Sequence, residues 1–370
     1  MSGVPVFVAR SWLLIAAGVM VLYGPSLAGG GLDLGLLGYA VAAAYAVALF
    51  LSVLVHELAH ALVAQRVGLP ATHIVINLWG GHTQFETEAP TPGRSFAVAV
   101  VGPLSNGALA VLAYVVLLTL DPFGVSARLL LAVAVTNAFV ALFNVVPGLP
   151  LDGGRMLEAL VWRVTGDRGT GTVVAGWAGR ILAVAVVLLA LLPFALGRPP
   201  SILLVIWAVL VGPMLWSGAG QAISSAGVRR RAQGLRVDRL LRPAGVVPLA
   251  ATVGDVLGVL TDPPFQERGR HDQGWHTMIW VVAPDGRVVG VLDPSAAASV
   301  PPERRPFVAV GSVAAAHDPR AVVAVELAGD DVVTALRGLP GDVYAVLDRG
   351  RVVGSLHATD VVAALSGTPT

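Results

Sequence analysis

Two histidines and a glutamate, His56, Glu57 and His60, form an H-E-x-x-H pattern inside a long apolar run. On an α-helix, residues four apart lie on one face, so both imidazoles can bind one Zn²⁺ while Glu57 faces the water that such an ion activates. The alternative is a hydrogen-bonded histidine pair without metal. Ionisable groups surrounded by lipid are costly and usually functional, so the pattern favours a catalytic zinc site.

A catalytic zinc needs a third protein ligand and keeps its fourth position for water or substrate. That ligand is expected from another helix, and one segment stands out, the run N-V-V-P-G-L-P-L-D-G-G-R that begins at Asn144. Its prolines end or break a helix, its Gly-Gly pair allows close backbone approach, and Asp152 is its only carboxylate. Asp152 is therefore the candidate third ligand. The open alternative is that Asp152 caps a helix that starts near Arg155.

The composition indicates a membrane protein. Hydrophobic residues make up 55% of the 370 positions and charged residues only 13%, which a water-soluble enzyme of this length could not reconcile with a polar surface. The net charge of +1 favours neither nucleic acid nor an acidic partner. Cysteine is absent, so disulfides are excluded and any zinc must be held by nitrogen and oxygen.

Six segments are apolar enough to cross about 30 Å of hydrocarbon: residues 11–27, 39–64, 96–120, 129–146, 173–196 and 202–223. Most arginines outside these spans fall on one side of a six-span arrangement, and only Arg128 and Arg198 fall on the other. The positive-inside rule then places both termini in the cytoplasm. It also places His60 toward the cytoplasmic end of the second span.

The H-E-x-x-H helix and the Asn144-x-x-Pro147-x-x-Pro150-Leu-Asp152-Gly run together resemble the site-2 protease family of intramembrane zinc metalloproteases. The resemblance covers roughly residues 40–164 and includes a Gly-Gly pair after the zinc helix and a Gly-Pro-Leu-Ser-Asn stretch in the third span. It implies a polytopic α-helical membrane protein that acts as a zinc endopeptidase.

The same resemblance implies the roles of individual residues. One Zn²⁺ per chain would be held by His56, His60 and Asp152, and Glu57 would be the general base. The resemblance also implies substrate contacts by Asn144, Gly80 and Gly81. For Asn106 it leaves a substrate contact open beside helix packing, the role that a polar residue within a span favours.

Residues 71–85, between the second and third spans, are rich in β-branched and aromatic side chains around a Gly-Gly turn signal. This pattern predicts a short β-hairpin near the membrane surface. The hairpin could pair its edge with an unwound substrate strand, or it could simply pack over the helices.

A second domain is expected after the run Arg229-Arg-Arg231, which gives boundaries of 1–228 for the membrane domain and 229–370 for a cytoplasmic one. Residues 280–293 align with residues 344–357 as strand, turn and strand, and a helix signal precedes each copy. These α/β repeats, about 235–300 and 306–366, resemble a tandem CBS pair. That module places the chain in the bacterial branch of the family.

CBS modules of the family often bind adenine nucleotides through a hydroxyl and a carboxylate after the second strand. Of those positions only Asp360 keeps the expected residue type, because Asp293, Ala296 and His357 occupy the others. The pattern therefore favours a structural, homodimerising or protein-recognising module over nucleotide binding.

The resemblance implies single-span membrane substrates, such as anti-sigma factors, membrane-tethered transcription factors or signal-peptide remnants, cleaved in the bacterial plasma membrane. Two other classes stay open at this point. A CBS-regulated zinc or ion transporter would need further polar residues along the bundle, and a catalytically silent scaffold would be expected to lack Glu57 or a ligand.

Overall fold

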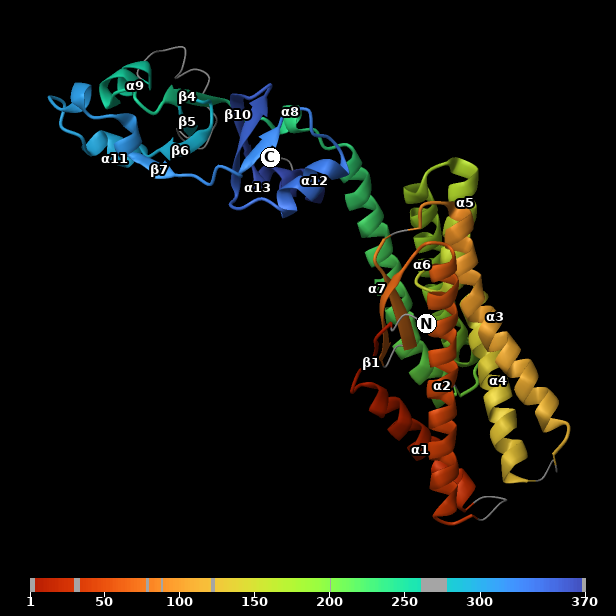
Figure 1. Ribbon diagram of the computed structural model, residues 1–370. Coiled ribbons are helices and arrows are strands. Elements are labelled where there is room, and N and C mark those ends of the chain that lie inside the picture. Colours follow the sequence, from red (N-terminus) through yellow and green to blue (C-terminus); the bar gives the residue numbers. More distant parts are fainter. Residues whose placement is uncertain are drawn as a thin grey trace. The chain divides into compact units, whose positions relative to one another are not determined.

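The computed structural model describes residues 4–29, 34–77, 80–87, 89–120, 124–199, 201–260 and 278–367. The chain divides into two compact units, Met1–Ala226 and Gly227–Thr370 (Figure 1). The first is mainly helical and the second combines helices with two sheets.

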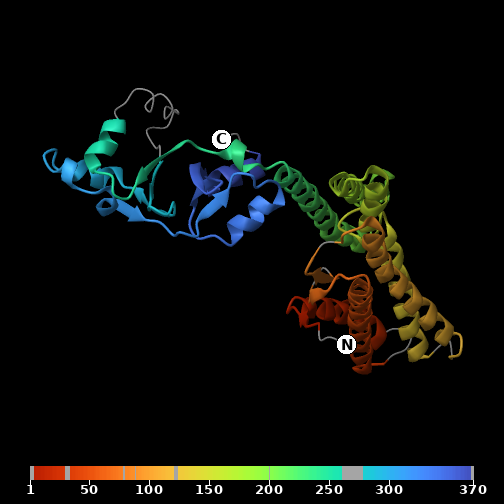
Figure 2. The same cartoon turned by 45° about the horizontal axis from the view of Figure 1, so that its top comes forward.

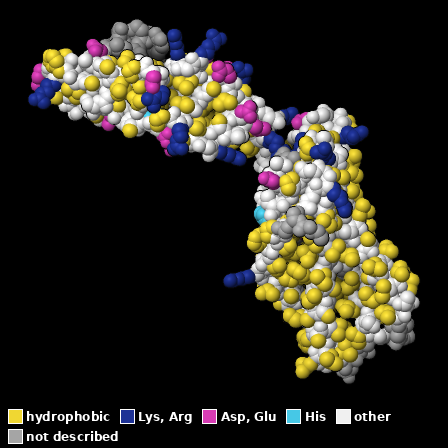
Figure 3. Space-filling view, viewed as in Figure 1, with side chains coloured by type: hydrophobic (Ala, Val, Ile, Leu, Met, Phe, Trp, Pro, Cys, Tyr) yellow, Lys and Arg dark blue, Asp and Glu magenta, His cyan; other side chains and the backbone are white. Residues whose placement is uncertain are grey.

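Five helices of the first unit are long and apolar enough to cross a membrane: α2 (Leu37–Arg66), α3 (Pro92–Leu117), α4 (Val125–Val145), α6 (Arg168–Ala195) and α7 (Ile202–Gln233). The expected first span forms α1 (Trp12–Ala28), whose 17 residues make it shorter than the others. Helices α3 and α4 lie side by side in both ribbon views (Figure 1, Figure 2). Hydrophobic side chains cover much of the visible face of this unit, as expected for helices that face lipid (Figure 3). The polytopic membrane fold is confirmed: the described residues contain five long apolar helices, and the shorter apolar helix α1 occupies the expected first span.

The predicted hairpin is present as β2 (Ala71–Asn77) and β3 (Gly80–Phe85), paired antiparallel. Residues 78–79 lie outside the described part of the chain, and Gly80 and Gly81, expected as the turn, begin strand β3 instead. A third strand that the sequence did not suggest, β1 (Val6–Val8), pairs with β2 in parallel and gives the order β1-β2-β3. Strand β3 therefore forms one edge of the sheet, and the buried Ile74 and Ile76 of β2 anchor the sheet on α2.

Helix α5 (Asp152–Thr165) begins at Asp152 itself and ends at Gly166, which adopts a left-handed conformation. The N-cap position belongs to Leu151, so Asp152 does not cap a helix that starts near Arg155. This corrects the capping alternative. The α5 helix is markedly more polar than the spans around it, and its Glu158 pairs with Arg168 at 2.7 Å.

The second unit contains the expected repeat. Each copy has a helix followed by two antiparallel strands: α9 (Val253–Leu260), β5 (Met278–Val282) and β6 (Val288–Leu292), then α12 (Asp330–Arg337), β9 (Val343–Asp348) and β10 (Arg351–His357). The sequence did not suggest the flanking strands: β4 (Ala244–Pro248), β7 (Ala314–Ala316) and β8 (Val322–Ala324). They complete two sheets, ordered β4-β5-β6-β7 and β10-β9-β8.

Short helices complete this unit: α8 (Val237–Leu240), α11 (Pro294–Ser299) and α13 (Ala358–Ser366). Fully buried Trp280 of the first sheet packs with Ala345 of the second, so the two repeats share a core.

Candidate metal centre

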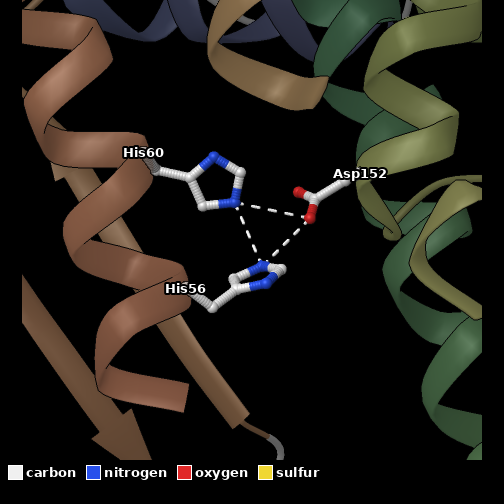
Figure 4. Close-up of side chains that lie close together, drawn as sticks. All are labelled: His56, His60 and Asp152. Atoms are coloured by element: carbon white, nitrogen blue, oxygen red, sulfur yellow. Dashed lines mark hydrogen bonds and ion pairs between the residues drawn. The ribbon is translucent and has the colours of Figure 1, made fainter. Parts of the chain in front are cut away.

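Three side chains from two helices meet inside the first unit (Figure 4). His56 Nε2 lies 3.1 Å from Asp152 Oδ2, His60 Nε2 lies 3.4 Å from the same oxygen, and the two Nε2 atoms are 3.1 Å apart. The histidines occupy one face of α2, one turn apart, and the aspartate is the first residue of α5. The loop before α5 therefore delivers a carboxylate from a distant part of the sequence to the histidine pair.

The hydrogen-bond partner of His60 Nδ1 shows which nitrogen of this ring carries the proton. His60 Nδ1 lies 2.7 Å from the carbonyl oxygen of Val98 in α3, and a carbonyl can only accept. Nδ1 therefore carries the proton, and in the neutral ring Nε2 presents a lone pair toward Asp152.

A chain of buried polar groups determines the same tautomer for His56. Ser52 donates to the carbonyl of Ala48 at 2.9 Å, so its oxygen accepts the bond of 3.0 Å from Asn137 Nδ2. Asn137 Oδ1 then accepts from Asn106 Nδ2 at 2.7 Å, which leaves Asn106 Oδ1 to accept from His56 Nδ1. The lone pair of His56 Nε2 therefore also faces the centre. Such outer partners are the usual means of orienting histidine ligands.

These residues fit a zinc ion. Two imidazole lone pairs and a carboxylate oxygen converge without a hydrogen to share among them, and Asp152 Oδ2 is buried with no hydrogen-bond partner among the described residues. Tetrahedral zinc with ligands at 2.0–2.1 Å separates neighbouring ligand atoms by about 3.3 Å, close to the three observed separations. The set of two nitrogens and one oxygen is one that catalytic zinc uses.

Glu57 follows His56 in α2, lines the same cavity as His56 and Asp152, and is 4% exposed. Thr83 of β3 donates a hydrogen bond of 2.8 Å to Glu57 Oε2. A Cβ atom at Gly81 would fall 2.3 Å from Glu57 Cγ, so only glycine lets β3 come this close. The hairpin therefore covers Glu57 and orients its carboxylate.

Helix α3 approaches the histidines equally closely at Gly102, where a Cβ atom would lie 2.3 Å from His60 Nε2. That glycine begins the Gly-Pro-Leu-Ser-Asn stretch noted in the sequence. Four residues later on the same helix, Asn106 meets His56. This stretch therefore supports both histidines: Gly102 leaves room for His60, and Asn106 forms a hydrogen bond with His56.

A cavity of about 1110 Å³ opens next to these groups and is lined by α1, α2, α3, α4, α5, α7 and the hairpin. Seven of the eight site residues expected in this unit line this cavity: His56, Glu57, Gly80, Gly81, Asn106, Asn144 and Asp152. His60 meets them through the metal-site contacts given above. Asp360 belongs to the second unit and is taken up with that unit below.

Two contributors were missed by sequence reasoning. Asn137 is 1% exposed in α4 and continues the hydrogen-bond chain behind His56. The sequence contained a signal for Asn137, because a side-chain amide inside an apolar span must find polar partners. Thr83 carried no such signal, since its contact with Glu57 depends on the position of β3 over α2.

In the second unit, Asp360 is 7% exposed and is held by Arg242 in a two-bond contact, with Arg242 Nε donating to Asp360 Oδ2 at 2.7 Å. The main chain of Arg242 also exchanges two hydrogen bonds of 2.9 Å with Ser355 of β10. Asp360 is therefore occupied by a partner from the same chain.

Comparison with known proteins places these observations in context. The model of peptidase family M50 matches residues 44–127 and 123–192. The chain is 30% identical over 325 residues to a Synechocystis protein provisionally named zinc metalloprotease sll0528, covering 84% of this chain and 79% of that protein.

Solved structures give two further likenesses. A site-2 protease from Methanocaldococcus jannaschii is 24% identical with a TM-score of 0.45, covering 60% of this chain and 92% of that one. The CBS domain of a membrane protein from Sphaerobacter thermophilus is 19% identical with a TM-score of 0.30, covering 40% of this chain and 96% of that one.

Proposed function

This chain belongs to peptidase family M50, the site-2 protease family of zinc metalloproteases, and from that premise we propose that it hydrolyses peptide bonds in or near the transmembrane segments of membrane-anchored regulatory proteins. The observation that carries the proposal is the position of one group of residues. His56, His60, Asp152 and Glu57 meet between long apolar helices, and a cavity reaches three of them. A protease with this arrangement can work on a chain that lies in lipid.

We assign the three converging atoms of His56, His60 and Asp152 as the zinc ligands and Glu57 as the general base. A zinc ion there would supply the positive charge that lowers the pKa of a water molecule and polarises the peptide carbonyl. Glu57 accepts the proton of the attacking water and passes it to the leaving amine. Thr83 holds the carboxylate of Glu57 in position through its hydrogen bond of 2.8 Å.

A transmembrane substrate hydrogen-bonds its own carbonyls within a helix, so a segment of it must unwind before cleavage. The edge strand β3 suits an unwound segment, because Gly80 and Gly81 line the cavity and one side of β3 has no strand partner among the described residues. We propose that the substrate adds to this edge as a further strand. Asn144, on the cavity wall, is the side chain we assign to the substrate carbonyl or its developing charge.

Asn106 also lines the cavity, but both of its amide atoms are engaged, with His56 on one side and Asn137 on the other. We therefore assign it to the support of His56 in place of a substrate contact.

The substrates we propose are single-span proteins, namely anti-sigma factors, membrane-tethered transcription factors or signal-peptide remnants. We propose a location in the bacterial plasma membrane. The excess of arginine on one side of the six-span arrangement, with α1 as the first span, supports a cytoplasmic position of both termini and of the second unit. That arrangement brings the metal centre toward the cytoplasmic face, where a cleaved regulator would be released.

We propose that the second unit is a tandem CBS module that regulates access or forms a homodimer. A nucleotide site at Asp360 is not favoured, because Arg242 already occupies both oxygens of that carboxylate. Binding a ribose there would require breaking a charge-assisted, two-bond contact.

A cleavage assay tests the proposal. The purified full chain is reconstituted with zinc and incubated with a library of single-span membrane peptides, with Glu57→Gln as the matched inactive control. The proposal requires products cut within or beside the spans in the wild type only. If no peptide in the library is cut, or if Glu57→Gln cuts as fast as the wild type, the proposed activity is wrong.

A further inference from the structure

Arg180 is a charged residue on an otherwise apolar helix. It lies near the middle of α6, and the fifteen residues that follow it, 181–195, contain no polar side chain. Among the described residues it has no carboxylate partner, although Arg168 on the same helix pairs with Glu158. A cation inside a membrane helix is expensive and calls for a specific reason.

Two tryptophans hold the guanidinium in place. Its central carbon lies 4.9 Å from the ring centre of Trp177 on α6 and 5.0 Å from that of Trp216 on α7. Such contacts attract a cation to the face of an indole ring. They offer no acceptor, however, and Arg180 Nε is buried without a hydrogen-bond partner. The cation is positioned, but its hydrogen-bonding capacity is not used.

The surroundings of the cation face outward. The side chains of Trp177, Trp216 and Ile181 are 52%, 48% and 68% exposed, and they belong to helices that are long and apolar enough to cross a membrane. Exposed apolar surface on such helices faces lipid. A group of the bilayer is therefore well placed to supply the missing acceptor.

The depth of Arg180 suits a lipid headgroup. The first half of α6 runs beside the polar helix α5 and the loop before it, since Glu158 of α5 pairs with Arg168 and Leu149 N of the loop donates to Ala175 O at 3.0 Å. Beyond Arg180 the helix is entirely apolar. Arg180 thus lies where polar surroundings give way to hydrocarbon, which is the level at which tryptophans gather in membrane proteins.

We propose that Arg180, clamped by Trp177 and Trp216, binds the phosphate of an anionic phospholipid headgroup. A guanidinium presents a planar fork of donors that matches a phosphate group. Free phosphate has the same chemistry but arrives from water, so the two sources can be told apart. This site is independent of the proposed proteolytic function.

Native mass spectrometry of the full chain tests the proposal with phosphatidylglycerol, phosphatidylcholine or inorganic phosphate added separately. Phosphatidylglycerol should remain bound to the wild type. Arg180→Ala should weaken that binding about fivefold, which corresponds to roughly 1 kcal/mol. Arg180→Lys keeps the charge but loses the planar fork of donors, so its affinity for phosphatidylglycerol should lie between those of the wild type and Arg180→Ala. Arg163→Ala removes the same charge from an exposed position of α5 and should bind as the wild type does.

Zinc content serves as the folding control, because Arg180 is not among the three converging ligand residues. If Arg180→Ala does not fold, Arg180→Lys carries the comparison. Equal retention of phosphatidylglycerol by the wild type and by the folded Arg180 variant would overturn the proposal. Inorganic phosphate that binds as tightly as the lipid would also overturn it, in favour of a soluble anion.

Discussion

Asn137 accepts a hydrogen bond of 2.7 Å from Asn106, and through that bond it determines which nitrogen of His56 carries the proton. Asn137 itself touches none of the three converging atoms. It acts through a chain that starts at Ser52 and whose direction is set by the carbonyl of Ala48. Both asparagines are 1% exposed.

Asn137→Ala should therefore weaken zinc binding by about 10–100-fold, the usual effect of losing an outer partner of a histidine ligand. Chelator competition measures the affinity, and the visible spectrum of the Co²⁺-substituted protein reports the changed ligand geometry. Thr136→Ala, the neighbouring polar residue of α4, is the control and should keep both. An unchanged Co²⁺ spectrum in Asn137→Ala would contradict a positioning role.

Glu57→Gln should lower cleavage by about 10²–10⁴-fold while zinc stays bound, because it removes a proton acceptor and keeps the shape of the side chain. The measurement is the rate on a peptide that the wild type cuts, together with zinc content. Thr83→Val should cost less, about tenfold or lower, since it removes only the hydrogen bond that orients Glu57. A variant Glu57→Gln that retains substantial turnover would mean that another group accepts the proton.

Gly102→Ala should reduce the zinc content, because its new methyl group would lie 2.3 Å from His60 Nε2. Gly107→Ala is a matched control on the same helix, since a Cβ atom there meets nothing within 4 Å. Zinc analysis of both purified variants gives the comparison. Full zinc occupancy in Gly102→Ala would show that α3 can move away from the histidines at little cost.

Arg242→Ala should free Asp360 while leaving the shared core of the second unit intact. Calorimetric titration with ATP, ADP and AMP should show no micromolar binding to the wild type. If a nucleotide binds at all, it should bind only to Arg242→Ala, and the double variant Arg242→Ala with Asp360→Ala should lose that binding. Micromolar binding by the wild type that is lost in Asp360→Ala would instead indicate an energy-sensing module.

The same variant has a consequence for His357. Burial, and secondarily the charge of Arg242, hold the pKa of His357 below its ordinary value of 6.5, while Asp360 acts in the opposite direction. The folded state therefore binds fewer protons than the unfolded state near that pH, so the unit loses stability as the pH falls below about 6.5.

Arg242→Ala should raise the pKa of His357 and so reduce the loss of stability on acidification. An NMR titration of the His357 ring measures the shift. A pKa that falls in Arg242→Ala would show that the Arg242 charge does not act on this histidine.

The membrane fold could be predicted from long apolar runs, and the repeat of the second unit from two segments that align. The meeting of His56 and His60 with Asp152 could be predicted because the histidines are spaced for one helix face and Asp152 is a single carboxylate at the right depth. What the sequence could not provide depends on contacts between distant segments. The closeness of Gly81 to Glu57 and the bond from Thr83 follow from how β3 lies over α2. The contact of Arg242 with Asp360 joins residues from opposite ends of the second unit.

Strand β1 was missed because three residues are too few to show a period. The first expected span, residues 11–27, was assigned from hydropathy alone, and the helix found there, α1, is shorter than the other spans. Arg180 carried the clearest overlooked signal, a charge within an apolar span, but its partners Trp177 and Trp216 come together only through the packing of α6 on α7.

The central claim is that His56, His60 and Asp152 hold one zinc ion beside Glu57, and zinc K-edge X-ray absorption on the full chain measures this most directly. The wild type should contain about one zinc per chain, with nitrogen and oxygen neighbours at about 2.0–2.2 Å and the outer scattering of two imidazoles. Asp152→Ala should lose one of these neighbours or the metal itself, and the double variant His56→Ala with His60→Ala should bind none. A full zinc complement with an unchanged spectrum in that double variant would contradict the account.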